Sequence, residues 1–95
     1  MQFTQRLHEG IRSGDITISV RIWKSPRVRV GNRYKLGDGV IHVDTLREIA
    51  LDDITPQLAR RSGFNGVVDL LKIAKHGSGE KVYLVEFHYL SAKEA

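Results

Sequence analysis

The chain of 95 residues contains no cysteine, one methionine, two prolines and no long apolar run. The lack of cysteine excludes disulfide bonds, thiol catalysis and zinc sites built on thiolates. A helix that spans a bilayer needs about 20 apolar residues, and neither such a run nor a secretory leader within Met1–Glu9 is found. We therefore expect a cytoplasmic protein without a membrane partner.

The composition that remains is that of a folded globular chain, with 41% hydrophobic and 27% charged residues. The length fits one domain with a modest core. We predict a single domain over residues 1–95, in which residues 91–95 form a loose C-terminal tail.

The charge is unevenly distributed along the chain. Residues 1–35 carry eight basic and two acidic side chains, for a net charge of +6, whereas residues 36–95 carry seven and nine, for a net charge of −2. Most of the early basic residues are arginines, whose guanidinium binds phosphate through two parallel hydrogen bonds. This asymmetry favours a polyanionic partner, RNA or DNA before anionic lipid. The alternative is a basic surface that serves only solubility.

The segment from Gly14 to Ile22 organises the first half of the chain. Gly14 can end a short helix over residues 4–13, and the residues after it alternate strictly between apolar and polar. The polar side of the resulting strand carries Thr17, Ser19 and Arg21. Such a side can line a binding groove, or it can be the solvated face of an antiparallel sheet.

The rest of the chain is rich in strands, with its helices grouped together. Extended segments are predicted at 27–30, 33–36, 40–51 and 81–90, with a tight turn at 37–39 and a bulge where the alternation changes phase near Thr45. Thr55 and Pro56 are typical of a helix start. That helix should end at Gly63, and a second one should run from Asn65 or Gly66 to 76–77, followed by a turn at 78–79. This order predicts an antiparallel α+β fold that closes as a small barrel.

The order and spacing of several short motifs resemble the ASCH domain family, in its small single-domain bacterial form. The family hallmark, Gly-x-Lys-x-x-(Glu or Thr)-x-Arg, corresponds to Gly14, Ile16, Ser19 and Arg21. Further matches across residues 3–90 are Phe3-Thr4-Gln5-Arg6, Val30-Gly31-Asn32, Asp53-Ile54-Thr55, Ser62-Gly63-Phe64 and Tyr83-Leu84-Val85-Glu86-Phe87. The resemblance implies a PUA-like pseudo-barrel of five to six mostly antiparallel strands with two to three short helices.

The same resemblance implies an RNA-binding module with a groove beside the hallmark segment. Single-stranded or modified RNA is the expected partner, because aromatic side chains in a basic groove can stack on unpaired bases. Thr17 and Ser19 would bond a base or sugar, Trp23 would stack on a base, and the phosphates would be met by Arg21, Lys24, Arg27, Arg29 and Arg33.

An enzyme is the alternative, because some bacterial members of the family are amidohydrolases that act on acetylated cytidine. Their lysine, threonine and glutamate correspond here to Ile16, Ser19 and Ser62. Isoleucine cannot carry a proton and serine cannot replace a carboxylate as acid or base, so Ser19 would be catalytic only if another base activates it. This activity, on a modified nucleoside or another small amide, is therefore disfavoured. RNA cleavage and a sensor of a small ligand or protein partner remain further alternatives.

No metal or cofactor is predicted. The four histidines lack a metal-binding spacing, although His42 with Asp44 and Glu86 with His88 form pairs on one strand face. Such pairs are common by chance. The glycine-rich segments at 37–39 and 77–79 lack the Gly-Lys-Ser/Thr ending of a phosphate loop. The oligomeric state is left open by the sequence.

Overall fold

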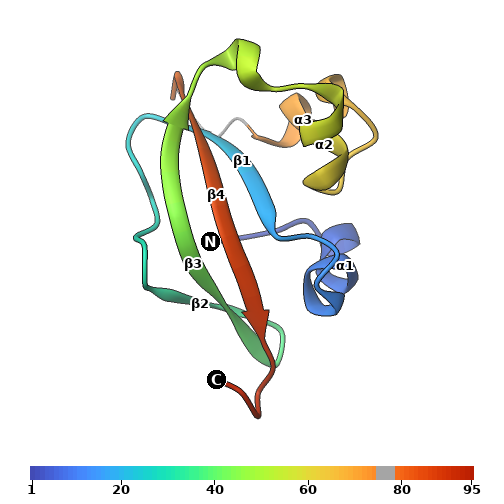
Figure 1. Cartoon of the computed structure of the whole chain (residues 1–95), viewed down its shortest axis with the longest axis vertical. Coiled ribbons are helices and arrows are strands. Elements are labelled where there is room, and N and C mark those ends of the chain that lie inside the picture. The colour runs from blue at the N-terminus through green and yellow to red at the C-terminus, as the bar shows by residue number, and fades with distance from the viewer. Residues whose placement is uncertain (75–78) are drawn as a thin grey trace.

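A four-stranded antiparallel sheet forms the centre of the molecule. The computed structural model describes residues 1–74 and 79–95, and in these ranges the strand order is β1-β4-β3-β2. The strands are β1 (Ile18–Trp23), β2 (Arg33–Leu36), β3 (Gly39–Ile49) and β4 (Lys81–Leu90). The long strands β3 and β4 curl together, so the sheet resembles half of a barrel (Figure 1).

Three short α-helices lie beside the β1 edge of the sheet, and the segment between β1 and β2 runs along the other side (Figure 1). The helices are α1 (His8–Ser13), α2 (Pro56–Arg61) and α3 (Val67–Ala74), with 3-10 turns at Gln5–Leu7 and Leu51–Asp53. The α+β class and the grouping of the helices are as predicted. Within the described ranges, no helix is long and apolar enough to cross a membrane.

The described residues contain four strands, which is fewer than the five to six expected. Residues 27–30 were predicted to be extended in a sheet, but they join no ladder. The amide of Arg29 donates instead to the hydroxyl of Tyr34, 3.0 Å away. Val28 is buried while both neighbouring arginines are exposed, so this segment is fixed by one apolar anchor instead of a neighbouring strand.

The predicted helix boundaries follow from local chemistry. Gly14 ends α1 with a φ of 87°, a left-handed conformation that glycine adopts without a steric penalty. At the start of α2, the Thr55 hydroxyl accepts a hydrogen bond of 3.1 Å from the amide of Leu58, and Pro56 occupies the first turn. The predicted end of the second helix at 76–77 lies outside the described residues, as does the first residue of the predicted turn at 78–79.

The predicted bulge lies in β3. Val43 pairs with Phe87 and Thr45 pairs with Glu86, so Asp44 is an extra residue opposite β4. A bulge bends its strand and increases the local twist, which fits the curl of β3 and β4. Because strand side chains alternate, the bulge also changes which residues of β3 face each side of the sheet.

Buried hydrophobic residues lie on both sides of the sheet, with Val20 and Leu84 on one side and Val85 and Phe87 on the other. Ile41 and Val43 on β3 are buried on the side of Phe87. The N-terminal segment covers this side, with the Phe3 ring centred 5.4 Å from that of Phe87. The opposite side of the sheet is partly open, and it holds the cleft described below.

Candidate functional site

The polar side of β1 is buried in the interior of the protein. Ser19 is 7% exposed and Arg21 is 8% exposed. The Nε of Arg21 donates to the Ser19 hydroxyl at 2.8 Å, and its Nη2 donates to the carbonyl of Gln2 at 2.6 Å. These side chains therefore do not form a solvated face, but they line a small hollow of about 190 Å³ together with Phe3, Phe64 and Ala74. The alternation located the two sides of the strand correctly but could not show that the N-terminal segment covers the polar one.

Arg21 is held by an aromatic ring as well as by hydrogen bonds. Its guanidinium carbon lies 4.9 Å from the centre of the Phe3 ring, within the range of cation–π contact. Burial lowers the pKa of Arg21 to about 10, so the side chain stays charged at neutral pH. A buried cation with these partners binds the N-terminal segment to the sheet.

The other residues predicted to bind nucleic acid lie in different places. Trp23 is buried with its ring 5.9 Å from that of Tyr83. It shares a hollow of about 290 Å³ with Arg21 and Arg27. Thr17 is exposed and lines another hollow, described below. The remaining predicted cations are all exposed, with Lys24 and Arg29 on the segment between β1 and β2 and Arg33 at the start of β2.

The positions that correspond to the amidohydrolase residues are used for packing. A Cβ added at Gly10 or Gly63 would lie 2.6 or 2.8 Å from Cδ1 of Ile16, so this side chain fills the space between α1 and the end of α2. The hydroxyl of buried Ser62 donates to the carbonyl of Leu58 at 2.7 Å. The described contacts of Ser19 are with Arg21, a cation that cannot accept the serine proton.

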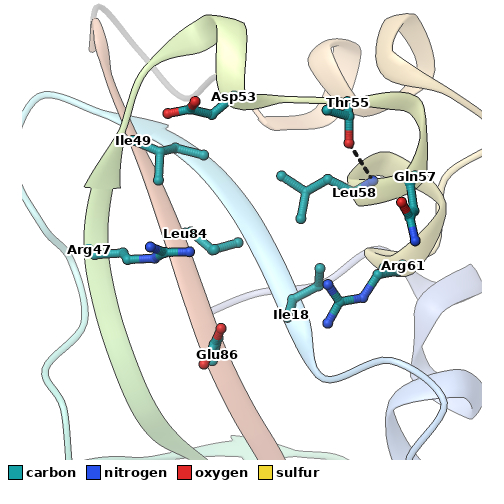
Figure 2. A pocket seen from close by; sticks show the side chains of 10 residues that line it. All are labelled: Ile18, Arg47, Ile49, Asp53, Thr55, Gln57, Leu58, Arg61, Leu84 and Glu86. Carbon is teal, nitrogen blue, oxygen red and sulfur yellow. Dashed lines mark hydrogen bonds between the residues drawn. The ribbon is translucent and has the colours of Figure 1, made fainter.

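A cleft of about 420 Å³ lies between the open side of the sheet and α2. Figure 2 shows that β1, β3 and β4 form one wall, and that α2 with the segment before it forms the other. Apolar and polar side chains contribute together to its lining, which consists of Ile18, Arg47, Ile49, Asp53, Thr55, Gln57, Leu58, Arg61, Leu84 and Glu86.

Two arginines dominate the electrostatics of this cleft. Arg47 projects from β3 and Arg61 from α2, and their guanidinium groups point toward each other across the opening (Figure 2). Neither makes an ion pair with any residue that the structure describes. Asp53 is engaged elsewhere, because its carboxylate accepts a hydrogen bond of 2.9 Å from the amide of Ala50. Two guanidinium groups are thus directed at a space large enough for a small anion or a nucleotide.

A second hollow of about 360 Å³ adjoins the cleft, since the two share Ile18, Arg61 and Glu86. Thr17, Asp44 and His88 complete much of its lining. Together the two hollows form a groove on the side of the sheet that carries Ile18 and Glu86, which pair across β1 and β4. Thr17 precedes the first residue of β1, so its side chain is not bound by the alternation that groups it with Ser19 and Arg21. Of the residues predicted from the hallmark segment, Thr17 borders this groove.

Arg47 and Arg61 were not predicted as site residues. Arg47 stands beyond the bulge in a strand whose phase has shifted, and Arg61 is one of two adjacent arginines in the last turn of a helix. The preceding Thr55-Pro56 cap, which fixes the start of α2, gives the helical phase that separates Arg61 from Arg60. That Arg61 faces the cleft could still not be predicted, because it depends on how α2 packs beside the sheet.

Comparisons with protein-family models, with curated proteins and with solved structures found no match to this chain.

Proposed function

We propose that this protein is an ASCH-like, PUA-like module that binds single-stranded or modified RNA through the groove between the open side of the sheet and α2. The observation that carries the proposal is that the guanidinium groups of Arg47 and Arg61, which form no ion pair with the described residues, are directed across a cleft of about 420 Å³. Arginine forks match the geometry of phosphate oxygens. The proposal rests also on the family resemblance of residues 3–90.

The lining of the cleft supports a nucleotide as ligand. Ile49 and Leu58 are half-buried and offer an apolar surface for a base, and Thr55 and Gln57 supply polar groups for hydrogen bonding. Thr17, in the adjoining hollow, would bond a sugar or base of the next nucleotide. The exposed cations Lys24, Arg27, Arg29 and Arg33 would add long-range attraction for the polyanion.

Within this proposal, Ser19, Arg21 and Trp23 support the domain instead of contacting RNA. All three are buried, and the first two are hydrogen-bonded to each other. The hydrolase alternative loses support from the same contacts, because Ser19 faces a cation and Ser62 bonds its own helix. Incubation with acetylated cytidine tests that alternative directly, and a Ser19→Ala control must abolish any turnover before Ser19 is assigned to it.

Fluorescence anisotropy of a labelled single-stranded RNA of about ten nucleotides tests RNA binding. Affinity should fall as salt rises, with a slope of roughly 0.7 per phosphate contact on a log–log plot. Arg47→Gln and Arg61→Gln should each weaken binding several-fold and reduce that slope by about one contact. Absence of binding at low salt, or binding that salt does not weaken, would overturn the proposal.

Arg60 provides a matched control for the cleft. It is exposed on α2 next to Arg61 but does not line the cleft. Arg60→Gln removes the same charge from the same helix, so its effect measures the general loss of electrostatic attraction. Equal losses for Arg60→Gln and Arg61→Gln would show that RNA binds outside the cleft.

A further inference from the structure

Two histidines and one aspartate converge at the end of the groove. His42 on β3 lies directly opposite His88 on β4, and Asp44 is the extra residue of the bulge beside them. The Nδ1 atoms of His42 and His88 lie 3.1 and 2.8 Å from the two different oxygens of the Asp44 carboxylate. The imidazole rings are 5.1 Å apart. Two side chains from β3 thus meet a histidine of β4 that lies 44 residues beyond Asp44 in the chain.

We propose that His42, Asp44 and His88 form a binding site for one divalent transition-metal ion of the zinc class. Imidazole and carboxylate are ligands that Zn²⁺ accepts, and three protein ligands leave a further coordination position for water or another ligand. The ligand atoms of the three residues all lie within 4.8 Å of one another. This inference is independent of RNA binding.

The geometry requires only a small closure around the ion. Bonds of about 2.0–2.1 Å in a tetrahedral site place ligand atoms roughly 3.3 Å apart. The three side chains are 28%, 40% and 48% exposed for His42, Asp44 and His88, so rotation about their side-chain bonds can draw the atoms inward. The backbone beneath them is fixed by the β3–β4 ladder, and ligands on rigid strands are positioned better than ligands on loops.

The bulge in β3 positions the Asp44 carboxylate beside the two histidines. Without an extra residue, the aspartate would pair with Glu86 on β4; the register instead pairs Thr45 with Glu86 and leaves Asp44 without a partner across the ladder. Bulges commonly redirect a side chain. The carboxylate thereby lies within hydrogen-bond distance of both imidazoles. The site also opens toward the groove, because Asp44 and His88 line the same hollow as Arg61.

Isothermal titration of the untagged, chelator-treated protein with ZnCl₂ tests the site. We expect saturation at one ion per chain and no comparable binding of Mg²⁺, which prefers oxygen ligands. His88→Gln and Asp44→Asn should each weaken Zn²⁺ binding at least about tenfold. Asp38→Asn is the control, because it removes the same charge from the exposed turn between β2 and β3. Equal Zn²⁺ affinity in wild type and His88→Gln would overturn the proposal.

Imidazole ¹⁵N spectra of the wild-type protein give a test that needs no variant to fold. Zn²⁺ should shift the ring nitrogens of His42 and His88, while those of His8 stay unchanged and serve as an internal reference. Shifts confined to His8 or His76, or distributed equally over all four histidines, would contradict the site. Neither titration contains RNA, so the result stands whether or not the RNA proposal holds.

Discussion

Arg21 and Ser19 are hydrogen-bonded to each other on the polar side of β1, with 2.8 Å between Nε and the hydroxyl oxygen. The same guanidinium donates to the carbonyl of Gln2, so one side chain connects the first strand to the N-terminal segment. Arg21 could stabilise the fold or bind a ligand, and these two roles predict different effects of its removal. A structural Arg21 contributes to the free energy of unfolding, whereas a ligand-binding Arg21 contributes to affinity.

Arg21→Ala should lower the free energy of unfolding by about 2–4 kcal/mol. It would leave the Ser19 hydroxyl and the Gln2 carbonyl without this donor and would open a cavity beside Phe3. Arg21→Lys should recover only part of that loss, because an ammonium lacks the planar fork that reaches both acceptors. Urea denaturation of both variants checks this. Unchanged stability together with weakened RNA binding would return Arg21 to the ligand-contacting role predicted from the sequence.

Gly63→Ala should destabilise the protein more than Gly14→Ala. Both glycines have left-handed backbones, with φ of 96° and 87°, which costs a residue with a Cβ about 1–2 kcal/mol. A Cβ at Gly63 would also lie 2.5 Å from Cδ2 of Leu7 and 2.8 Å from Cδ1 of Ile16. A Cβ at Gly14 would have no described atom within 4 Å. Overpacking adds about 1–3 kcal/mol. Urea denaturation measures both, and equal losses would mean that the contacts at Gly63 relax freely.

Thr55→Ala should lower the free energy of unfolding by about 1 kcal/mol through loss of the cap on α2. The Leu58 amide would lose its acceptor, which lies 3.1 Å away in the wild type. Thr55→Ser keeps the hydroxyl and should restore most of the stability. Thermal denaturation followed by circular dichroism compares the three proteins. If Thr55→Ser is as unstable as Thr55→Ala, the methyl group and not the hydrogen bond stabilises this helix start.

The ionisation of Asp69 should make the stability of the protein depend on pH. Its carboxylate accepts hydrogen bonds of 2.9 Å from the amide of Asn65 and 2.8 Å from Arg6. The Asn65 hydrogen bond is the main cause that lowers the pKa of Asp69 below its ordinary value of 3.8, and Arg6 adds to it. A folded-state pKa below the unfolded one stabilises the protein above pH 3.8, and this contribution disappears as the pH falls through the lower value.

Asp69→Asn should therefore be less stable than the wild type at neutral pH, and the difference should shrink toward zero in strong acid. Urea denaturation of both proteins from pH 7 down to about 2 measures it. Arg12→Gln, which changes an exposed charge at the end of α1, is a control that should show no such trend. A difference that stays constant over the whole range would mean that ionisation of Asp69 does not matter.

Much of the fold could be predicted because its signals are local. Gly14, the Thr55-Pro56 cap and the tight turn at 37–39 each fix the backbone through their own chemistry, and alternation located β1, β2, β3 and β4. Residues 27–30 were predicted wrongly as a strand because alternation also occurs in a segment with one buried anchor, Val28. A strand requires a partner, and the sequence of one segment does not contain that partner.

The sequence by itself determined that β1 has an apolar and a polar side, that β3 changes phase near Thr45, and that residues 1–35 are strongly basic. Only the tertiary structure decided that Ser19 and Arg21 are covered, that Arg47 and Arg61 face each other, and that His42 meets His88. The physical reason is the range of the interactions. Periodicity and capping act within a few residues, whereas coverage and convergence depend on strand register and on which segment packs against which side of the sheet.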